Sequence, residues 1–166
     1  MDNSFFDSIQ EHFGKSNTEP GQYSSLALAY IGDGVFDLII RTIILGLGNG
    51  KVNEFHRMAS NIVKAPSQAK IIRSVFDELT EEEMLVYKRG RNAKSATSAK
   101  NSSITDYRVA TGFEALTGYL YLANRLDRAL EIIKLGMERA GFLPLHKYRQ
   151  QPKKNIGKEI KYRKQS

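Results

Sequence analysis

The sequence has no cysteine among its 166 residues and only three histidines. The absence of cysteine excludes a disulfide scaffold and a metal site built from thiolates. The histidines (His12, His56 and His146) are far apart and belong to no His-Asp doublet or histidine-rich metal motif. A metal-dependent phosphohydrolase of small nucleotides, which would need such a motif, is therefore a weak candidate.

A long apolar run is also missing. Residues 38–47 come closest, but Arg41 and Gly46 interrupt them, and a membrane-spanning helix needs roughly 20 apolar residues. Residues 1–13 lack a basic start followed by a long apolar stretch, so we expect no secretory signal. These absences lead us to expect a cytoplasmic protein with no membrane partner.

The apolar residues that are present follow helical spacing. No run alternates apolar and polar side chains as a half-buried strand does, whereas residues 24–47 and 104–123 form two strongly apolar helical segments. Thr80 and Glu83 have the spacing of a capping box, which marks the beginning of another helix. The sequence therefore predicts an all-α fold of about six or seven helices.

The net charge of +7 is concentrated near the C-terminus. From residue 146 onward, eight lysines and arginines face a single acid, Glu159, and they account for the whole net charge. A basic arm of this kind favours polyanions such as nucleic acid, because binding releases counterions. A disordered solubilising tail is the alternative.

Two acids interrupt the apolar residues 27–40, and one of them has no local partner. On a helix, Asp33 and Asp37 share a face because they are four residues apart. Asp37 can pair with Arg41 at the next such position, whereas no residue three or four positions from Asp33 is a cation. Asp33 is therefore the acid that needs an explanation.

Glu114 repeats this pattern in the second apolar segment, since no cation lies three or four positions away from it. Burying an unpaired acid costs several kcal/mol, and two such acids brought together would repel each other. A hard divalent cation between Asp33 and Glu114 would remove both costs, and Mg²⁺ is commonly held by one or two carboxylates with retained waters. A surface position or an interhelical salt bridge for each acid is the alternative.

A basic, polar segment, residues 88–101, precedes the segment that carries Glu114. It has no apolar periodicity, which favours a loop, and its cations and hydroxyls suit the phosphates and 2′-hydroxyls of a double-helical RNA. The candidate RNA-binding residues are Lys88, Arg89, Arg91, Asn92, Lys94, Ser95 and Lys100. The alternative is an exposed helix end at which Lys88 and Arg89 offset the helix dipole.

These segments together resemble the catalytic domain of ribonuclease III. Residues 30–33 (YIGD) and 113–122 (FEALTGYLYL) are similar to its two signatures, with Asp33 and Glu114 at the two indispensable acids. Two further acids of the family pattern are replaced here by Ala29 and Thr111.

Residues 28–33, 88–95 and 107–108 resemble the Mini-III subgroup of the family. In that subgroup the two remaining acids suffice, and a separate double-stranded-RNA-binding domain is missing. The resemblance places the catalytic domain at residues 23–141, after an N-terminal helix and linker at residues 1–22 and before a basic tail at residues 142–166.

The resemblance implies a homodimeric, Mg²⁺-dependent endoribonuclease that cuts double-stranded RNA and leaves 5′-phosphates. Its expected substrate is a stem of the precursor of large-subunit (23S) ribosomal RNA, with a ribosomal protein as a helper. Asp33 and Glu114 would be the catalytic residues and metal ligands, and Tyr30 would contact the partner subunit. For Asp37 we favour pairing with Arg41 over a role in orienting metal-bound waters.

The two absent acids leave one alternative function open. A non-catalytic RNA-binding or ribosome-assembly protein could have the same fold. Cleavage of a base-paired RNA would distinguish the enzyme from this alternative.

Overall fold

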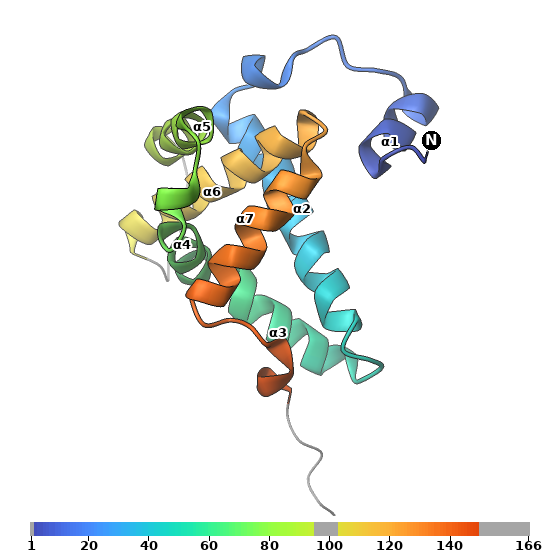
Figure 1. Ribbon diagram of the computed structural model, residues 1–166, viewed down its shortest axis with the longest axis vertical. Coiled ribbons are helices and arrows are strands. Elements are labelled where there is room, and N and C mark those ends of the chain that lie inside the picture. The colour runs from blue at the N-terminus through green and yellow to red at the C-terminus, as the bar shows by residue number, and fades with distance from the viewer. Residues whose placement is uncertain (1, 95–102, 150–166) are drawn as a thin grey trace, which may run out of the picture.

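The computed structural model describes residues 2–94 and 103–149. Within these ranges it has seven α-helices and no strand, which confirms the all-α prediction (Figure 1). The helices are α1 (Phe5–Phe13), α2 (Ser25–Leu45), α3 (Val52–Val63), α4 (Ala65–Arg73), α5 (Glu81–Asn92), α6 (Ile104–Leu122) and α7 (Leu126–Arg139). Short 3₁₀ turns lie at Pro20–Gln22, Phe76–Glu78 and Leu145–Tyr148.

In the described part of the chain, none of the helices has the length and hydrophobicity required to cross a membrane.

Helices α2 and α6 form the centre of the fold and make its most extensive helix–helix contact (Figure 1). Each begins at a serine whose side chain accepts a hydrogen bond from a backbone amide three residues on, Ser24 in α2 and Ser103 in α6. Their apolar faces meet in the core, where the rings of Phe36 and Phe113 pack edge to face with centroids 5.2 Å apart. Both apolar segments predicted from the sequence are thus central helices.

The two helices cross at very short range because glycines lie at the contact. A Cβ atom on Gly32 would lie 1.7 Å from the carbonyl oxygen of Glu114, and one on Gly118 would lie 2.0 Å from that of Leu28. No residue with a side chain could take either position without moving a helix. The crossing therefore fixes the backbone of Glu114 directly against the residue that precedes Asp33.

A buried acid joins α5 to α7. The side chain of Glu83 is 0% exposed and accepts hydrogen bonds from Arg128 Nε (2.7 Å) and Nη2 (3.0 Å). It also accepts from the amide of Thr80 at 2.9 Å, which completes the predicted capping box. Burial works to raise the pKa of Glu83, but the bonds from Arg128 and Thr80 and the charges of Arg128 and Arg125 outweigh it and hold the pKa below its usual value.

Replacing Arg128 with alanine is expected to lower the free energy of unfolding by about 3 kcal/mol, because it leaves the buried carboxylate of Glu83 without its main partner. Arg125→Ala is the matched control, since Arg125 lies 3.9 Å from the same carboxylate but is 43% exposed, and it should cost about 1 kcal/mol or less. Urea unfolding followed by circular dichroism measures both. Equal losses would show that Arg128 is no more important to Glu83 than a surface ion pair.

Candidate active site

The structure brings Asp33 and Glu114 together at the crossing of α2 and α6. Asp33 follows Gly32, which packs against the Glu114 backbone, and the two carboxylates are close enough to repel. Burial and the charge of Asp33 raise the pKa of Glu114 to about 7, against the opposing effect of a hydrogen bond from Gln68. Asp33 is exposed, so the alternative of a surface position is what the structure has for this acid, yet partial desolvation of its carboxylate and the charge of Asp37 raise its pKa as well.

Neither acid has a cationic partner among the described residues. No lysine, arginine or histidine of residues 2–94 and 103–149 forms an ion pair with Asp33 or Glu114, and the alternative of an interhelical salt bridge is not seen there. The Glu114 side chain accepts a hydrogen bond from the neutral amide of Gln68. Two mutually repelling carboxylates without a cation are what a divalent metal ion would stabilise.

The residues present fit a hard divalent cation. No third His, Cys, Asp or Glu joins the two acids in the part of the chain that the structure describes. The amide oxygen of Gln68, however, is buried without a hydrogen-bond partner there, on the amide group that contacts Glu114. Carboxylate and amide oxygens suit Mg²⁺, which retains several waters and needs few protein ligands.

Gln68 is the residue of this site that the sequence analysis missed. It lies in the first turn of α4, is 2% exposed, and donates from Nε2 to the Val63 carbonyl oxygen (2.8 Å) and to Glu114 Oε1 (3.1 Å). The available signal was its position one helical turn before Ile72, which places a polar residue on the inward face of a helix.

The positions of the two absent acids are filled by small buried residues. Ala29 is 6% exposed, and Thr111 is 7% exposed with its hydroxyl donating to the Tyr107 carbonyl oxygen at 3.0 Å. Neither residue can supply a negative charge. The candidate site therefore depends on Asp33 and Glu114 as its two carboxylates.

Asp37 forms an ion pair with Arg41 at the surface. Its Oδ2 accepts a hydrogen bond from Arg41 Nε at 2.7 Å, in an i,i+4 pair in which both side chains are substantially exposed. This is the arrangement that we favoured from the sequence. A role for Asp37 in orienting metal-bound waters stays a prediction.

The basic segment 88–101 is not a loop at its beginning, because residues 88–92 are the last residues of α5. The loop prediction is wrong for residues 88–92. The structure instead has the alternative, an exposed helix end. Packing on α6 extends the helix: Tyr87 is buried, and a Cβ on Gly90 would lie 2.7 Å from that of Ala115. This contact places the basic end of α5 beside the helix that carries Glu114.

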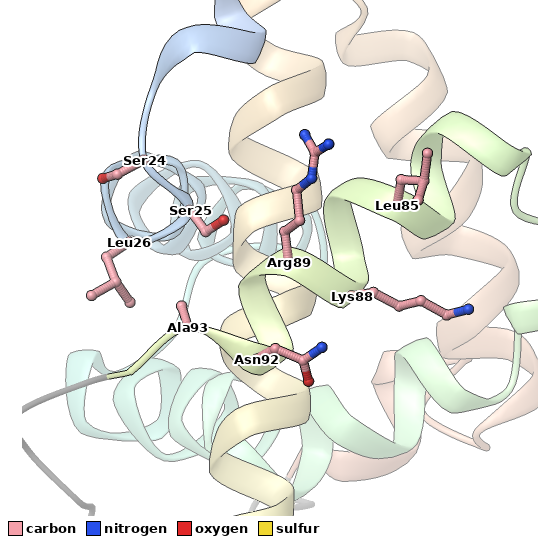
Figure 2. A pocket seen from close by; sticks show the side chains of 8 residues that line it. All are labelled: Ser24, Ser25, Leu26, Leu85, Lys88, Arg89, Asn92 and Ala93. Carbon is pink, nitrogen blue, oxygen red and sulfur yellow. The ribbon is translucent and has the colours of Figure 1, made fainter.

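Three of the RNA-binding candidates, Lys88, Arg89 and Asn92, line an open pocket of about 560 Å³ between the end of α5 and the start of α2. Figure 2 shows Arg89 extending beside Ser25, whereas Lys88 points away from α2. The pocket therefore combines cationic, amide and hydroxyl groups.

The other candidates are placed differently. Arg91 lies over the ring of Tyr87 at 5.7 Å and donates to Asn92 Oδ1, and Lys94 is exposed just beyond α5. Ser95 and Lys100 lie outside the described residues.

Three large apolar side chains of α2 face solvent. Leu26, Tyr30 and Leu38 are 40%, 83% and 52% exposed, and Leu26 and Tyr30 lie one helical turn apart. Large exposed apolar side chains gathered on one helix are typical of a surface that contacts another protein. Tyr30, the predicted dimer contact, is the most exposed of the three.

The Ribonuclease III domain family matches residues 26–125, and this match places the helical fold in the ribonuclease III class of hydrolases. The chain is 48% identical over 122 residues to the Mini-ribonuclease 3 of Enterococcus faecalis, covering 72% of this chain and 92% of that protein. It is 50% identical over 128 residues to the Mini-ribonuclease 3 of Clostridium tetani, covering 76% of this chain and 83% of that protein. The chain belongs to the Mini-ribonuclease 3 family.

A solved structure supports the fold. The crystal structure of a protein from Fusobacterium nucleatum matches with a TM-score of 0.67 and 28% identity, over 73% of this chain and 98% of that one. The family relation confirms the resemblance seen in the sequence and makes the chain a double-strand-specific endoribonuclease of a divalent-metal-dependent family. The roles of individual residues stay predictions.

Proposed function

We propose that Asp33 and Glu114 together hold Mg²⁺ and that the chain uses this site to hydrolyse phosphodiester bonds in base-paired RNA, leaving 5′-phosphates. The observation that carries the proposal is the meeting of two acids without a cationic partner in the described residues, one of them with its pKa raised to about 7. Mg²⁺ bound there would lower the pKa of a bound water and stabilise the negative charge of the transition state.

The protein's own part is to hold the reacting groups. Gly32 lets α2 approach α6, so that both carboxylates reach one site, and the Gln68 amide fixes one oxygen of Glu114. The basic end of α5 would contact phosphates and 2′-hydroxyls, through Lys88, Arg89 and Asn92, and would position the duplex by shape instead of by sequence.

A homodimer would supply two such sites, one for each strand. The exposed side chains of Leu26, Tyr30 and Leu38 support this arrangement, because covering them with a second copy would remove three large apolar side chains from water. The substrate would be a stem of the 23S ribosomal RNA precursor, so the protein would act in ribosome biogenesis in the cytoplasm with a ribosomal protein helper. The basic residues of the proposed tail from 150 onward lie outside the described residues.

Cleavage of a 5′-labelled RNA duplex by the purified protein, with and without Mg²⁺, tests the proposal. We expect cleavage that requires Mg²⁺ and that falls by at least about 1,000-fold in Asp33→Asn, because losing a metal ligand removes several kcal/mol of transition-state stabilisation. Glu138→Gln, which neutralises an exposed acid of α7, is the control and should cleave at the native rate. Duplex binding without cleavage by the native protein would favour the non-catalytic RNA-binding alternative.

A further inference from the structure

Helix α4 places the polar side chain of Gln68 beside the proposed metal site. The helix packs on α6, next to which it lies in Figure 1, and its first turn carries Gln68 toward Glu114. Gln68 is 2% exposed, which is unusual for a glutamine. A buried amide group of this kind is expected to form hydrogen bonds through both its nitrogen and its oxygen.

The orientation of this amide is set by its neighbours. Both hydrogens of Nε2 are engaged, one with the Val63 carbonyl oxygen at 2.8 Å and one with Glu114 Oε1 at 3.1 Å. Rotating the amide by half a turn would place its oxygen against these same two acceptors, which would repel it. The amide therefore restrains Oε1 of Glu114, while no hydrogen bond within the described residues uses Oε2.

The oxygen of the same amide has no partner. Within residues 2–94 and 103–149, Gln68 Oε1 is the one buried side-chain nitrogen or oxygen that forms no hydrogen bond. It belongs to the same amide group that donates to Glu114. Leaving a carbonyl oxygen buried and unpaired is costly, so a donor is expected in the working protein. A carboxylate that holds a metal ion is ionised and cannot donate a hydrogen bond, whereas a water polarised by that cation is a strong donor.

We propose that Gln68 is a positioning residue of the metal site, which orients Glu114 through Nε2 and accepts a hydrogen bond from a metal-bound water through Oε1. This inference rests on the proposed metal site at Asp33 and Glu114. It explains how a site with Ala29 and Thr111 in place of acids holds its waters: Gln68 adds an oxygen without adding a charge. Two carboxylates then match the charge of a divalent ion.

The test compares Gln68→Met with a neighbouring control. Methionine keeps the length of the side chain but removes both hydrogen-bonding groups, whereas Ser67→Ala changes an equally buried polar residue whose hydroxyl bonds the Asn61 carbonyl oxygen instead of Glu114. Binding of Mn²⁺ to the RNA-free protein, followed by electron paramagnetic resonance, gives the metal affinity. The Mg²⁺ concentration for half-maximal cleavage and the KM for a duplex RNA are measured beside it.

Gln68→Met should weaken Mn²⁺ binding and raise the half-maximal Mg²⁺ concentration by about 10- to 100-fold, with little change in the KM for RNA. Ser67→Ala should leave all three values unchanged. Gln68→Leu also removes both hydrogen-bonding groups and should weaken Mn²⁺ binding by a similar factor. It decides the matter if Gln68→Met does not fold, because native affinity in a folded Gln68→Leu would then overturn the proposal.

Native metal affinity in a folded Gln68→Met would also overturn it and would leave Gln68 a packing residue. Failure of the underlying metal site gives a different result. In that case the native protein and Asp33→Asn would bind Mn²⁺ equally, whatever residue stands at position 68.

Discussion

Gly32→Ala is expected to destabilise the protein by about 3 kcal/mol or more and to slow RNA cleavage by at least about 100-fold. The added Cβ would lie 1.7 Å from the Glu114 carbonyl oxygen, a backbone atom that no rotamer change can move away. Helix α2 must therefore shift from α6, which loses core packing and also separates Asp33 from Glu114. A displacement of about 1 Å between catalytic groups can cost two orders of magnitude in rate.

The control for stability is Gly34→Ala in the same helix. A Cβ there meets nothing within 4 Å, so replacing a helical glycine with alanine should raise the free energy of unfolding by about 0.5–1 kcal/mol. Thermal unfolding and single-turnover cleavage measure the two effects. A Gly32→Ala protein with native stability and rate would show that the site does not depend on the close crossing.

Glu114→Gln is expected to abolish cleavage while making the metal-free protein more stable. The pKa of Glu114 is raised to about 7 in the folded state, first by burial and then by the charge of Asp33. An acid with a raised pKa takes up protons on folding, so stability declines as the pH rises from the ordinary pKa of a glutamate toward 7 and stays low above it. Ionised Glu114 therefore destabilises the metal-free protein at pH 8, by about 3 kcal/mol.

Glutamine cannot ionise but can still accept the hydrogen bond from Gln68. In Glu114→Gln the decline between pH 5 and 8 should flatten, and the metal-free protein at pH 8 should melt about 5 °C or more above the native protein. Thermal unfolding with a chelator present, at a series of pH values, measures this. Cleavage should fall by at least about 1,000-fold, because a metal ligand is lost. A variant that melts below the native protein at pH 8 would contradict the account.

The sequence was sufficient to identify the helices of the candidate site and the two acids that meet there. Asp33 and Glu114 were detectable because an acid without a local cation is conspicuous in an apolar helix. The beginnings of α2 and α5 were detectable because Ser24 and Thr80 are local caps, whose partners lie three residues away.

The features that escaped sequence reasoning depend on contacts between distant residues. Gln68 meets Glu114 only when α4 packs on α6, and Arg128 of α7 meets Glu83 of α5 only in the folded protein. No local pattern encodes either pair. The helical state of residues 88–92 was missed for the same reason, since contacts of α5 with α6, and not the sequence of those residues, favour the helix there.

Our central proposal is that Asp33 and Glu114 are two halves of a single cation site. Titration of the RNA-free protein with Mn²⁺, followed by electron paramagnetic resonance, tests it most directly. The native protein and Glu138→Gln should bind Mn²⁺ equally, whereas Asp33→Asn and Glu114→Gln should each bind it at least about 100-fold more weakly, because each removes one of two charged ligands. Native affinity in both of these variants would contradict the claim.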